Sequence, residues 1–360
     1  MIFIELIIIF LLSFILIFTL RRIAKNVGLV DKPSLRKSHS GFIPLVGGIS
    51  ISLTLSMVLF LHPALIIKYN VFLFCSSILV LTGIIDDKNN IQVNIRLAIQ
   101  IFVSIVAIQF GNISIHNLGA IFSPKELTLA PLLSNIVTIL AIVGAMNAFN
   151  MIDGIDGLLG GVTIVIFSAL GYLFWLNNNV ELYYFCSIVI VAVIPYLILN
   201  LEFIFGKNLK VFMGDAGSLF IGFTVVWLLL NGTQANSSPS FKPVTALWLI
   251  AFPLMDMTTI IISRIQNGRS PFQPDKQHLH HKLQVLGVPN RLILFILCGF
   301  SAIFAYIGIW SEINDISEVV MLFSFSSLFV VYFILVSYIY PCYLKVFCQA
   351  QARRPEQGAT

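Results

Sequence analysis

Five aspartates at the ends of long apolar runs are the residues of this chain best suited to chemistry. They are Asp86, Asp87, Asp153, Asp156 and Asp215. The chain has 16 acidic residues in all and is 58% hydrophobic, so carboxylates at these places are costly and are functional candidates. Brought to one membrane face, the five would form a site for Mg²⁺ and phosphate groups, because Mg²⁺ binds through a few carboxylates together with phosphate oxygens.

Asp86 and Asp87 are adjacent carboxylates in the string GIIDDKNN, at the end of an apolar run. One interpretation is a pair that binds a divalent ion or takes a proton from an acceptor phosphate. The other is a solvated turn that terminates a helix. The C-terminal end of a helix carries a partial negative charge and disfavours anions, which favours the functional interpretation.

The string NAFNMIDGIDGLLGG places Asp153 and Asp156 three residues apart, on one face if the segment is helical. Asn147 and Asn150 add amide groups on nearby turns. The glycines alone are typical of close helix packing in membranes. Glycines combined with two Asp and two Asn instead favour a site for a ligand with hydroxyl, amide and phosphate groups.

Asp215 stands in VFMGDAGS, at the start of another apolar run, with Gly214 and Ser218 close by. Free N–H groups at a helix start bind phosphate, and a carboxylate beside them can hold the Mg²⁺ that bridges the same phosphate. Plain capping of the helix by Asp215 is the alternative. Capping accounts for the aspartate but not for the glycines on both sides of it.

Three histidines, His278, His280 and His281, lie in the string DKQHLHHKL, and Arg264 adds positive charge to the same predicted loop. Such groups can contact phosphates or donate to a leaving group. A zinc site and a purely structural loop are the alternatives. Zinc is disfavoured because no cysteine is near and because the carboxylates elsewhere suit an oxygen-binding ion such as Mg²⁺ or Mn²⁺.

Two further groups of polar residues are weaker candidates. Arg36, Lys37 and His39 in the first polar loop look like an anion-binding segment, although a basic loop also anchors a membrane protein. Asp256 either pairs with Arg264 or lines the site.

The elements that must position these residues are membrane helices. Only 10% of the residues are charged, against roughly 25% in a soluble domain, and apolar stretches of about 20 residues recur, each long enough to span a bilayer. The sequence predicts an all-α polytopic membrane protein with eleven spans. These are 2–20, 45–62, 71–85, 95–112, 131–149, 158–176, 182–200, 216–231, 244–262, 292–310 and 319–344. The first has no basic leader and is interpreted as a retained helix.

The basic residues predict the orientation. The chain has 21 Lys and Arg residues, and with the N-terminus in the periplasm all but Lys68, Lys125 and Lys242 fall on the cytoplasmic side, as the positive-inside rule expects. The C-terminus is then cytoplasmic, and all the polar clusters lie at the cytoplasmic face. We expect one integral-membrane domain over 1–344 and a short cytoplasmic tail over 345–360.

The motifs together resemble those of the polyprenyl-phosphate N-acetylhexosamine-1-phosphate transferases. The matching strings, in family order, are DKPSLRKSH with IPLVGG, IIDD, NAFNMIDGIDGL, VFMGDAGS and HLHH. The resemblance is closest to the WecA-like branch. The MraY branch typically has PTMGG and three consecutive histidines, where this chain has PLVGG and HLHH.

The resemblance implies transfer of GlcNAc-1-phosphate from UDP-GlcNAc to undecaprenyl phosphate, the first step of O-antigen or enterobacterial common antigen synthesis, in the bacterial inner membrane. It implies Mg²⁺, with Mn²⁺ as a substitute, held first by Asp215. Asp86 or Asp87 would assist the metal or act as base. Asp153, Asp156 and Asn150 would contact the nucleotide sugar, and the three histidines would steady its diphosphate.

Other readings stay open at this point. The donor could carry another UDP-N-acetylaminosugar, and a homodimer is one candidate assembly, while no nucleic-acid partner is expected. A cation-coupled transporter is the rival function. Transporter sites, however, lie near the membrane midplane between repeated halves, and this chain shows no internal repeat.

Overall fold

Helices account for almost all of the computed structural model, which describes residues 2–32, 41–122, 125–202, 204, 206–235, 239–271 and 277–340. The α-helices of this part are α1 (Ile2–Val27), α2 (Gly47–Leu61), α3 (Tyr69–Asn89), α4 (Val93–Gly111), α5 (Pro131–Ile152), α6 (Leu158–Leu176), α7 (Val180–Asn200), α8 (Gly214–Thr233), α9 (Pro243–Leu249), α10 (Ala251–Gln266), α11 (Leu279–Val285), α12 (Asn290–Ile313) and α13 (Glu318–Ile334). Strands β1 (Val30–Asp31) and β2 (Ile43–Pro44) pair antiparallel, and three short helical turns complete the set: η1 (Pro63–Leu65), η2 (Lys207–Leu209) and the π-helix η3 (Leu335–Ile339).

The chain is a multi-pass membrane protein, as predicted. Within the described residues nine helices are long and apolar enough to cross a membrane, or ten if α9 and α10 form one bent span. A count of eleven requires α2 to cross as well, and its 15 residues are fewer than the roughly 20 that a straight span needs. The count of eleven spans and the orientation in the membrane therefore stay predictions.

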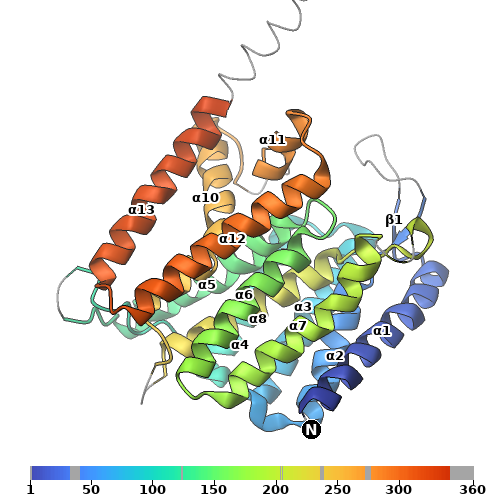
Figure 1. The fold of residues 1–360 in the computed structure, drawn as a ribbon, viewed down its shortest axis with the longest axis horizontal. Coiled ribbons are helices and arrows are strands. Elements are labelled where there is room, and N and C mark those ends of the chain that lie inside the picture. Colours follow the sequence, from blue (N-terminus) through green and yellow to red (C-terminus); the bar gives the residue numbers. More distant parts are fainter. Residues whose placement is uncertain are drawn as a thin grey trace, which may run out of the picture.

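Helix α8 is the centre of the bundle, and nearly all of its residues are buried. It packs against α2, α3 and α5, whereas α1 and α13 lie at opposite edges of the bundle (Figure 1). Glycines allow the close approach. A Cβ at Gly83 of α3 would collide with the backbone of Ala216, and a Cβ at Gly48 of α2 would collide with the backbone of Gly217. Small residues of this kind commonly hold membrane helices together.

The predicted span 244–262 is broken into α9 and α10, which meet at an angle of 79°. Helix α9 ends at Leu249, and Pro253 follows four residues later. Proline has no N–H to donate to the carbonyl group four residues before it, so the helical ladder fails at Leu249. The bend opens space on the side of α5 and α8.

The loops that carry the polar clusters share one end of the bundle. In Figure 1 the N-terminus lies at one end, and β1 and α11 lie at the other. The segment before α2 is fastened there to the segment before α8: the Phe212 N–H donates to Pro44 O at 2.9 Å, and the Gly47 N–H donates to Phe212 O at 2.9 Å. This contact fixes the starts of two central helices relative to each other.

Candidate active site

The two adjacent aspartates at the end of α3 have different surroundings. Asp86 is buried; its Oδ2 lies 3.0 Å from Nη1 of Arg96, and its Oδ1 accepts the Ile91 N–H at 2.8 Å. Asp87 reaches α8 instead, where its Oδ1 accepts the Asp215 N–H at 3.0 Å. Its Oδ2 is buried and has no hydrogen-bond partner among the described residues. Asp87 therefore keeps a free carboxylate oxygen, whereas Asp86 is neutralised by a cation.

Asp215 lies in the first turn of α8. Gly214 before it has φ +76°, which favours glycine, and a Cβ there would also lie 2.5 Å from Asp87 Oδ2. Nδ2 of Asn150, from the end of α5, donates to Asp215 Oδ1 at 2.6 Å and to Ser218 Oγ at 2.9 Å. Five predicted site residues thus meet where α3, α5 and α8 come together.

Asp153 and Asp156 lie in a turn between α5 and α6, not on a shared helical face. Helix α5 ends at Ile152, with Asp153 as its C-cap, and Gly157 has φ +77° before α6 begins. The condition for a shared helical face is therefore not met, because α5 ends at Ile152, before both aspartates. Burial, followed by the charges of Asp215 and Asp156, raises the pKa of Asp153 to about 7.

A lysine that the sequence analysis did not single out completes this turn. Lys210 Nζ lies 2.7 Å from Asp156 Oδ2 and 2.9 Å from Glu202 Oε1, and it also lies over the ring of Phe212. Burial is the largest influence on its pKa and lowers it, but hydrogen bonds from the two carboxylates and their charges outweigh burial and raise the pKa. Two carboxylates thus fix the position of the Lys210 cation beside the turn that is predicted to bind the nucleotide.

The three histidines lie at the start of α11 and touch the same turn. The His278 and His280 rings are stacked with centroids 5.4 Å apart, and the His280 and His281 centroids are 4.2 Å apart. His280 is buried, and among the described residues its Nε2 has no hydrogen-bond partner. A Cβ added to Gly154 would lie 2.0 Å from that nitrogen. The histidines and the turn after α5 therefore form two sides of one site.

The surroundings of His280 determine its protonation. Burial, followed by the charges of His281 and His278, lowers the pKa of His280 to about 3, so His280 is neutral at ordinary pH. Nδ1 of His281 lies 3.0 Å from Gln284 Oε1. In the described part of the chain no group of three or more His, Cys, Asp or Glu side chains could hold a metal ion by itself.

The sequence is similar to those of known proteins. Residues 69–233 match glycosyl transferase family 4. The undecaprenyl-phosphate alpha-N-acetylglucosaminyl 1-phosphate transferase of Escherichia coli O157:H7 is 45% identical over 329 residues, which are 91% of this chain and 89% of that protein. The proteins of the same name from Haemophilus influenzae and Yersinia pestis are 44% and 43% identical, over about nine-tenths of each chain. This chain belongs to glycosyl transferase family 4.

Membership of glycosyl transferase family 4 confirms the family expected from the motifs. The family match begins with α3 and ends with α8, so it includes all five aspartates. The histidine helix α11 lies beyond it, although the full-length relatives extend over it. The contact between Gly154 and His280 joins the two regions.

Other predicted site residues lie apart from this centre. Asn147 donates to Gln100 Oε1 at 2.8 Å and to Val143 O at 2.8 Å, so its amide is turned toward α4 and its own helix. Arg264 is buried and donates to the carbonyl of Pro271. The candidates Arg36, Lys37 and His39 lie outside the described residues.

Asp256 also has a definite partner. Its Oδ2 lies 2.8 Å from Nδ1 of His278, so within the described residues it pairs with a histidine and not with Arg264. Arg96 and Lys210 were missed altogether. The available signal was their sequence proximity to the DD and GDAGS strings, which does not indicate the carboxylate that each would face.

The donor atoms at α8 fit an oxygen-binding divalent cation. Asp87 offers a buried oxygen without a partner in the described structure, and the neighbouring Asp215 carboxylate lies close enough for the two charges to interact. Mg²⁺ is usually held by one or two carboxylates, with phosphates and water supplying the remaining ligands. A site with few protein ligands therefore suits a cation that arrives with a diphosphate.

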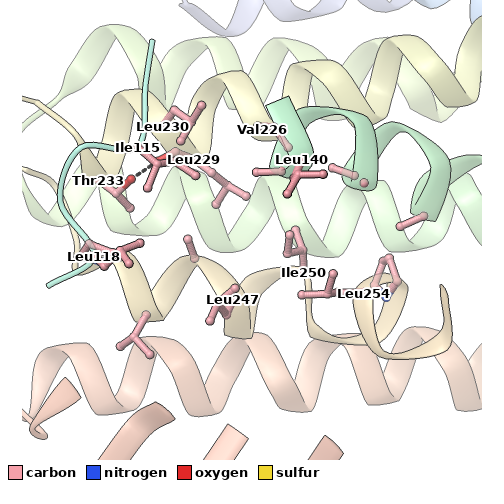
Figure 2. A pocket seen from close by; sticks show the side chains of 18 of the residues that line it. Ile115, Leu118, Leu140, Val226, Leu229, Leu230, Thr233, Leu247, Ile250 and Leu254 are labelled. Atoms are coloured by element: carbon pink, nitrogen blue, oxygen red, sulfur yellow. Dashed lines mark hydrogen bonds between the residues drawn. The ribbon is translucent and has the colours of Figure 1, made fainter. Parts of the chain in front are cut away.

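An apolar cavity of about 350 Å³ lies between α5, the C-terminal half of α8 and the bent pair α9–α10, and its lining runs from Ile115 and Gln234, at the other end of α8 from Asp215, to Phe149. Figure 2 shows Leu140, Leu229 and Leu247 projecting toward it from these elements. Phe149, which also lines the cavity, immediately precedes Asn150 of the polar cluster. The cavity could therefore hold an apolar chain whose polar end reaches the carboxylates.

Proposed function

We propose that this protein transfers GlcNAc-1-phosphate from UDP-GlcNAc to undecaprenyl phosphate in the bacterial inner membrane. A phosphate oxygen of the lipid attacks the β-phosphorus of the donor, and the bond between that phosphorus and the bridging oxygen of UMP breaks. The products are UMP and undecaprenyl-pyrophosphoryl-GlcNAc. In the family that the motifs resemble, this product is the starting point of O-antigen or enterobacterial common antigen synthesis.

One observation carries the proposal: nine-tenths of the chain is similar to proteins whose name states this transfer. The geometry supports it independently. Phosphoryl transfer needs charge neutralisation and positioning more than covalent chemistry from the protein. The carboxylates at the start of α8 could hold a cation that neutralises the diphosphate. Lys210 and the histidines could contact phosphate oxygens, and the apolar cavity could hold the lipid chain of the acceptor.

Asp215 and Asp87 would hold Mg²⁺, or Mn²⁺ in its place, and the ion would neutralise charge on the diphosphate. Asp87 is better suited than Asp86 to this role or to accepting the proton of the acceptor phosphate. Both oxygens of Asp86 are engaged by Ile91 and Arg96, whereas Asp87 Oδ2 has no partner in the described structure. Because the second pKa of a phosphate monoester is about 6, no strong base is needed.

The turn after α5 would bind the nucleotide sugar. Asp153 and Asp156 offer acceptors for its hydroxyl and amide groups, and Asn150 orients the Asp215 carboxylate by donating to it. Lys210, held at Asp156, would offset the negative charge of the diphosphate on this side. His278, His280 and His281 would contact the diphosphate from the opposite side of the turn, where His280 meets Gly154.

The prenyl chain of the acceptor would occupy the cavity shown in Figure 2. The chain would move from lipid into protein, so close packing rather than removal from water would favour it there, and the end of the cavity at Phe149 would place the phosphate on the side of Asn150 and Asp215. A water-soluble acceptor would have no use for such a cavity.

Two alternatives give different outcomes in one assay. Another UDP-N-acetylaminosugar would use the same chemistry, and a cation-coupled carrier would release no UMP. The protein, purified in detergent, is given undecaprenyl phosphate, MgCl₂ and, in separate reactions, UDP-GlcNAc, UDP-GalNAc and UDP-MurNAc-pentapeptide. UMP release only with UDP-GlcNAc, and its loss on adding EDTA, is the expected result. Release from another donor changes the sugar, and no release from any donor contradicts the proposal.

A further inference from the structure

Asp256 of α10 is a buried carboxylate outside the magnesium and nucleotide groups described above, and it joins three separate elements. Only 1% of its surface is exposed. Its Oδ2 lies 2.8 Å from Nδ1 of His278, and its Oδ1 accepts the Leu279 N–H at 3.1 Å and the Tyr332 hydroxyl of α13 at 3.0 Å. A buried charge needs partners of this kind to be tolerated.

The donors identify which nitrogen of His278 carries a proton. An ionised carboxylate can only accept hydrogen bonds, so Nδ1 of His278 donates and is the protonated nitrogen. Nε2 is then the nitrogen left to contact a ligand. A partner that fixes the tautomer and the ring orientation of a histidine in this way tunes what the other nitrogen can do.

The segment that follows α13, made of η3 and Tyr340, also contacts the histidine helix. Nζ of Lys282, on α11, donates to Val336 O at 2.7 Å, and the Tyr340 hydroxyl donates to Lys282 O at 3.0 Å. Helix α13 is otherwise largely exposed at the edge of the bundle (Figure 1). Near its start, Glu318 and Met321 accept hydrogen bonds from Ala120 and Trp248, whereas at its other end Tyr332 and the segment that follows contact Asp256 and the histidine helix.

We propose that Asp256 and Tyr332 are positioning residues that fix the tautomer and orientation of His278, and that α13 acts as a brace for the histidine helix. The inference rests on the proposed function, because it assumes that His278 acts on the donor diphosphate. Tyr332 does not touch that substrate in this account. It acts by holding the carboxylate that holds the imidazole.

The test is a double-mutant cycle. Tyr332→Phe removes one hydroxyl and keeps the ring, and it is compared in the wild-type and His278→Gln backgrounds by kcat and KM for UMP release. Tyr338→Phe is the matched control, because Tyr338 lies on the same terminal segment but is exposed. Loss of a partner that orients a ligating histidine typically costs 10- to 100-fold. We expect Tyr332→Phe to lower kcat about tenfold, with KM for UDP-GlcNAc nearly unchanged.

In the His278→Gln background Tyr332→Phe should have almost no further effect, because the group it orients is gone. An equal loss in both backgrounds contradicts the proposal, since Tyr332 would then act independently of His278. Asp256→Asn should reduce kcat more than Tyr332→Phe does. The melting temperature in detergent establishes that each variant is folded.

A second readout does not depend on activity. Hydrogen exchange of amides 279–285 should accelerate in Tyr332→Phe and stay at the wild-type rate in Tyr338→Phe, because the Leu279 N–H shares the Asp256 carboxylate with Tyr332. Unchanged exchange in Tyr332→Phe overturns the proposal. If the wild type releases no UMP from any donor, the proposed function fails, and this exchange measurement alone still decides whether α13 braces the histidine helix.

Discussion

Replacing Gly154 by alanine tests whether the spacing between the nucleotide-binding turn and the histidine helix sets the rate. Gly154 has no positive φ, so alanine is compatible with its backbone. Its Cβ, however, would lie 2.0 Å from His280 Nε2, whereas nonbonded heavy atoms pack at about 3.5 Å. The turn and the imidazole must therefore separate by about 1.5 Å. A displacement of about 1 Å in a catalytic arrangement can cost about 100-fold, and we expect a loss of kcat of that size.

The assay is the initial rate of UMP release at saturating UDP-GlcNAc and undecaprenyl phosphate. Gly299→Ala in α12 is the matched control, because a Cβ there meets nothing within 4 Å, and its rate should equal that of the wild type. The melting temperature of Gly154→Ala in detergent establishes that the variant is folded; we expect it to fall modestly, because the added Cβ displaces the buried His280. A wild-type kcat in folded Gly154→Ala would refute the reasoning, because the contact with His280 would then have no bearing on turnover.

Four further outcomes are expected. Asp215→Asn should abolish turnover while the protein still folds, and full activity at saturating Mg²⁺ would remove Asp215 from the metal site. His280→Ala and His281→Ala should each lower kcat by about two orders of magnitude, as loss of a preorganised donor does; wild-type rates would make this helix purely structural. Lys210→Met should raise KM for UDP-GlcNAc about tenfold, because Asp156 then faces the diphosphate without a cation, and an unchanged KM would exclude this role. The pKa of His280 is about 3 in the folded state against 6.5 ordinarily, so the unfolded chain binds the extra proton as the pH falls below 6.5, and stability is lost from there toward pH 3. Between pH 6.5 and pH 3 the melting temperature of His280→Gln should fall less than that of the wild type. An equal fall would contradict the lowered pKa of His280 in the folded protein.

The helical fold could be read from the sequence because membrane helices need long apolar runs, and such runs are visible without any tertiary information. The break in the ninth predicted span was missed, although Pro253 was its signal. Apolar composition continues through 244–262 on both sides of the proline, so a hydrophobicity pattern alone shows one span. The missing N–H donor of Pro253 is what divides this stretch into the two helices α9 and α10.

The meeting of the aspartates could also be predicted, because alternating spans place the ends of α3 and α5 and the start of α8 on one side. The particular partners could not. That Asp86 faces Arg96 while Asp87 faces the start of α8 depends on the rotation of α3 about its axis. Helix α5 ends at Ile152, and Asp153 is its C-cap. Where the helix ends depends on how Gly154 and Gly157 fit against neighbouring segments, and the three-residue spacing of the two aspartates does not reveal that end point.

The burial of α8 bears on how the protein is assembled in the membrane. Of the nine described helices long enough to span a bilayer, α8 has the lowest mean hydropathy and the largest buried share. It is therefore the span with the weakest preference for lipid. Its main packing partners, α2, α3 and α5, precede it in the chain and are therefore synthesised before it. We therefore expect α8 to enter the membrane against helices that have already been made, so that the segment beginning with Gly214 and Asp215 is not surrounded by lipid alone.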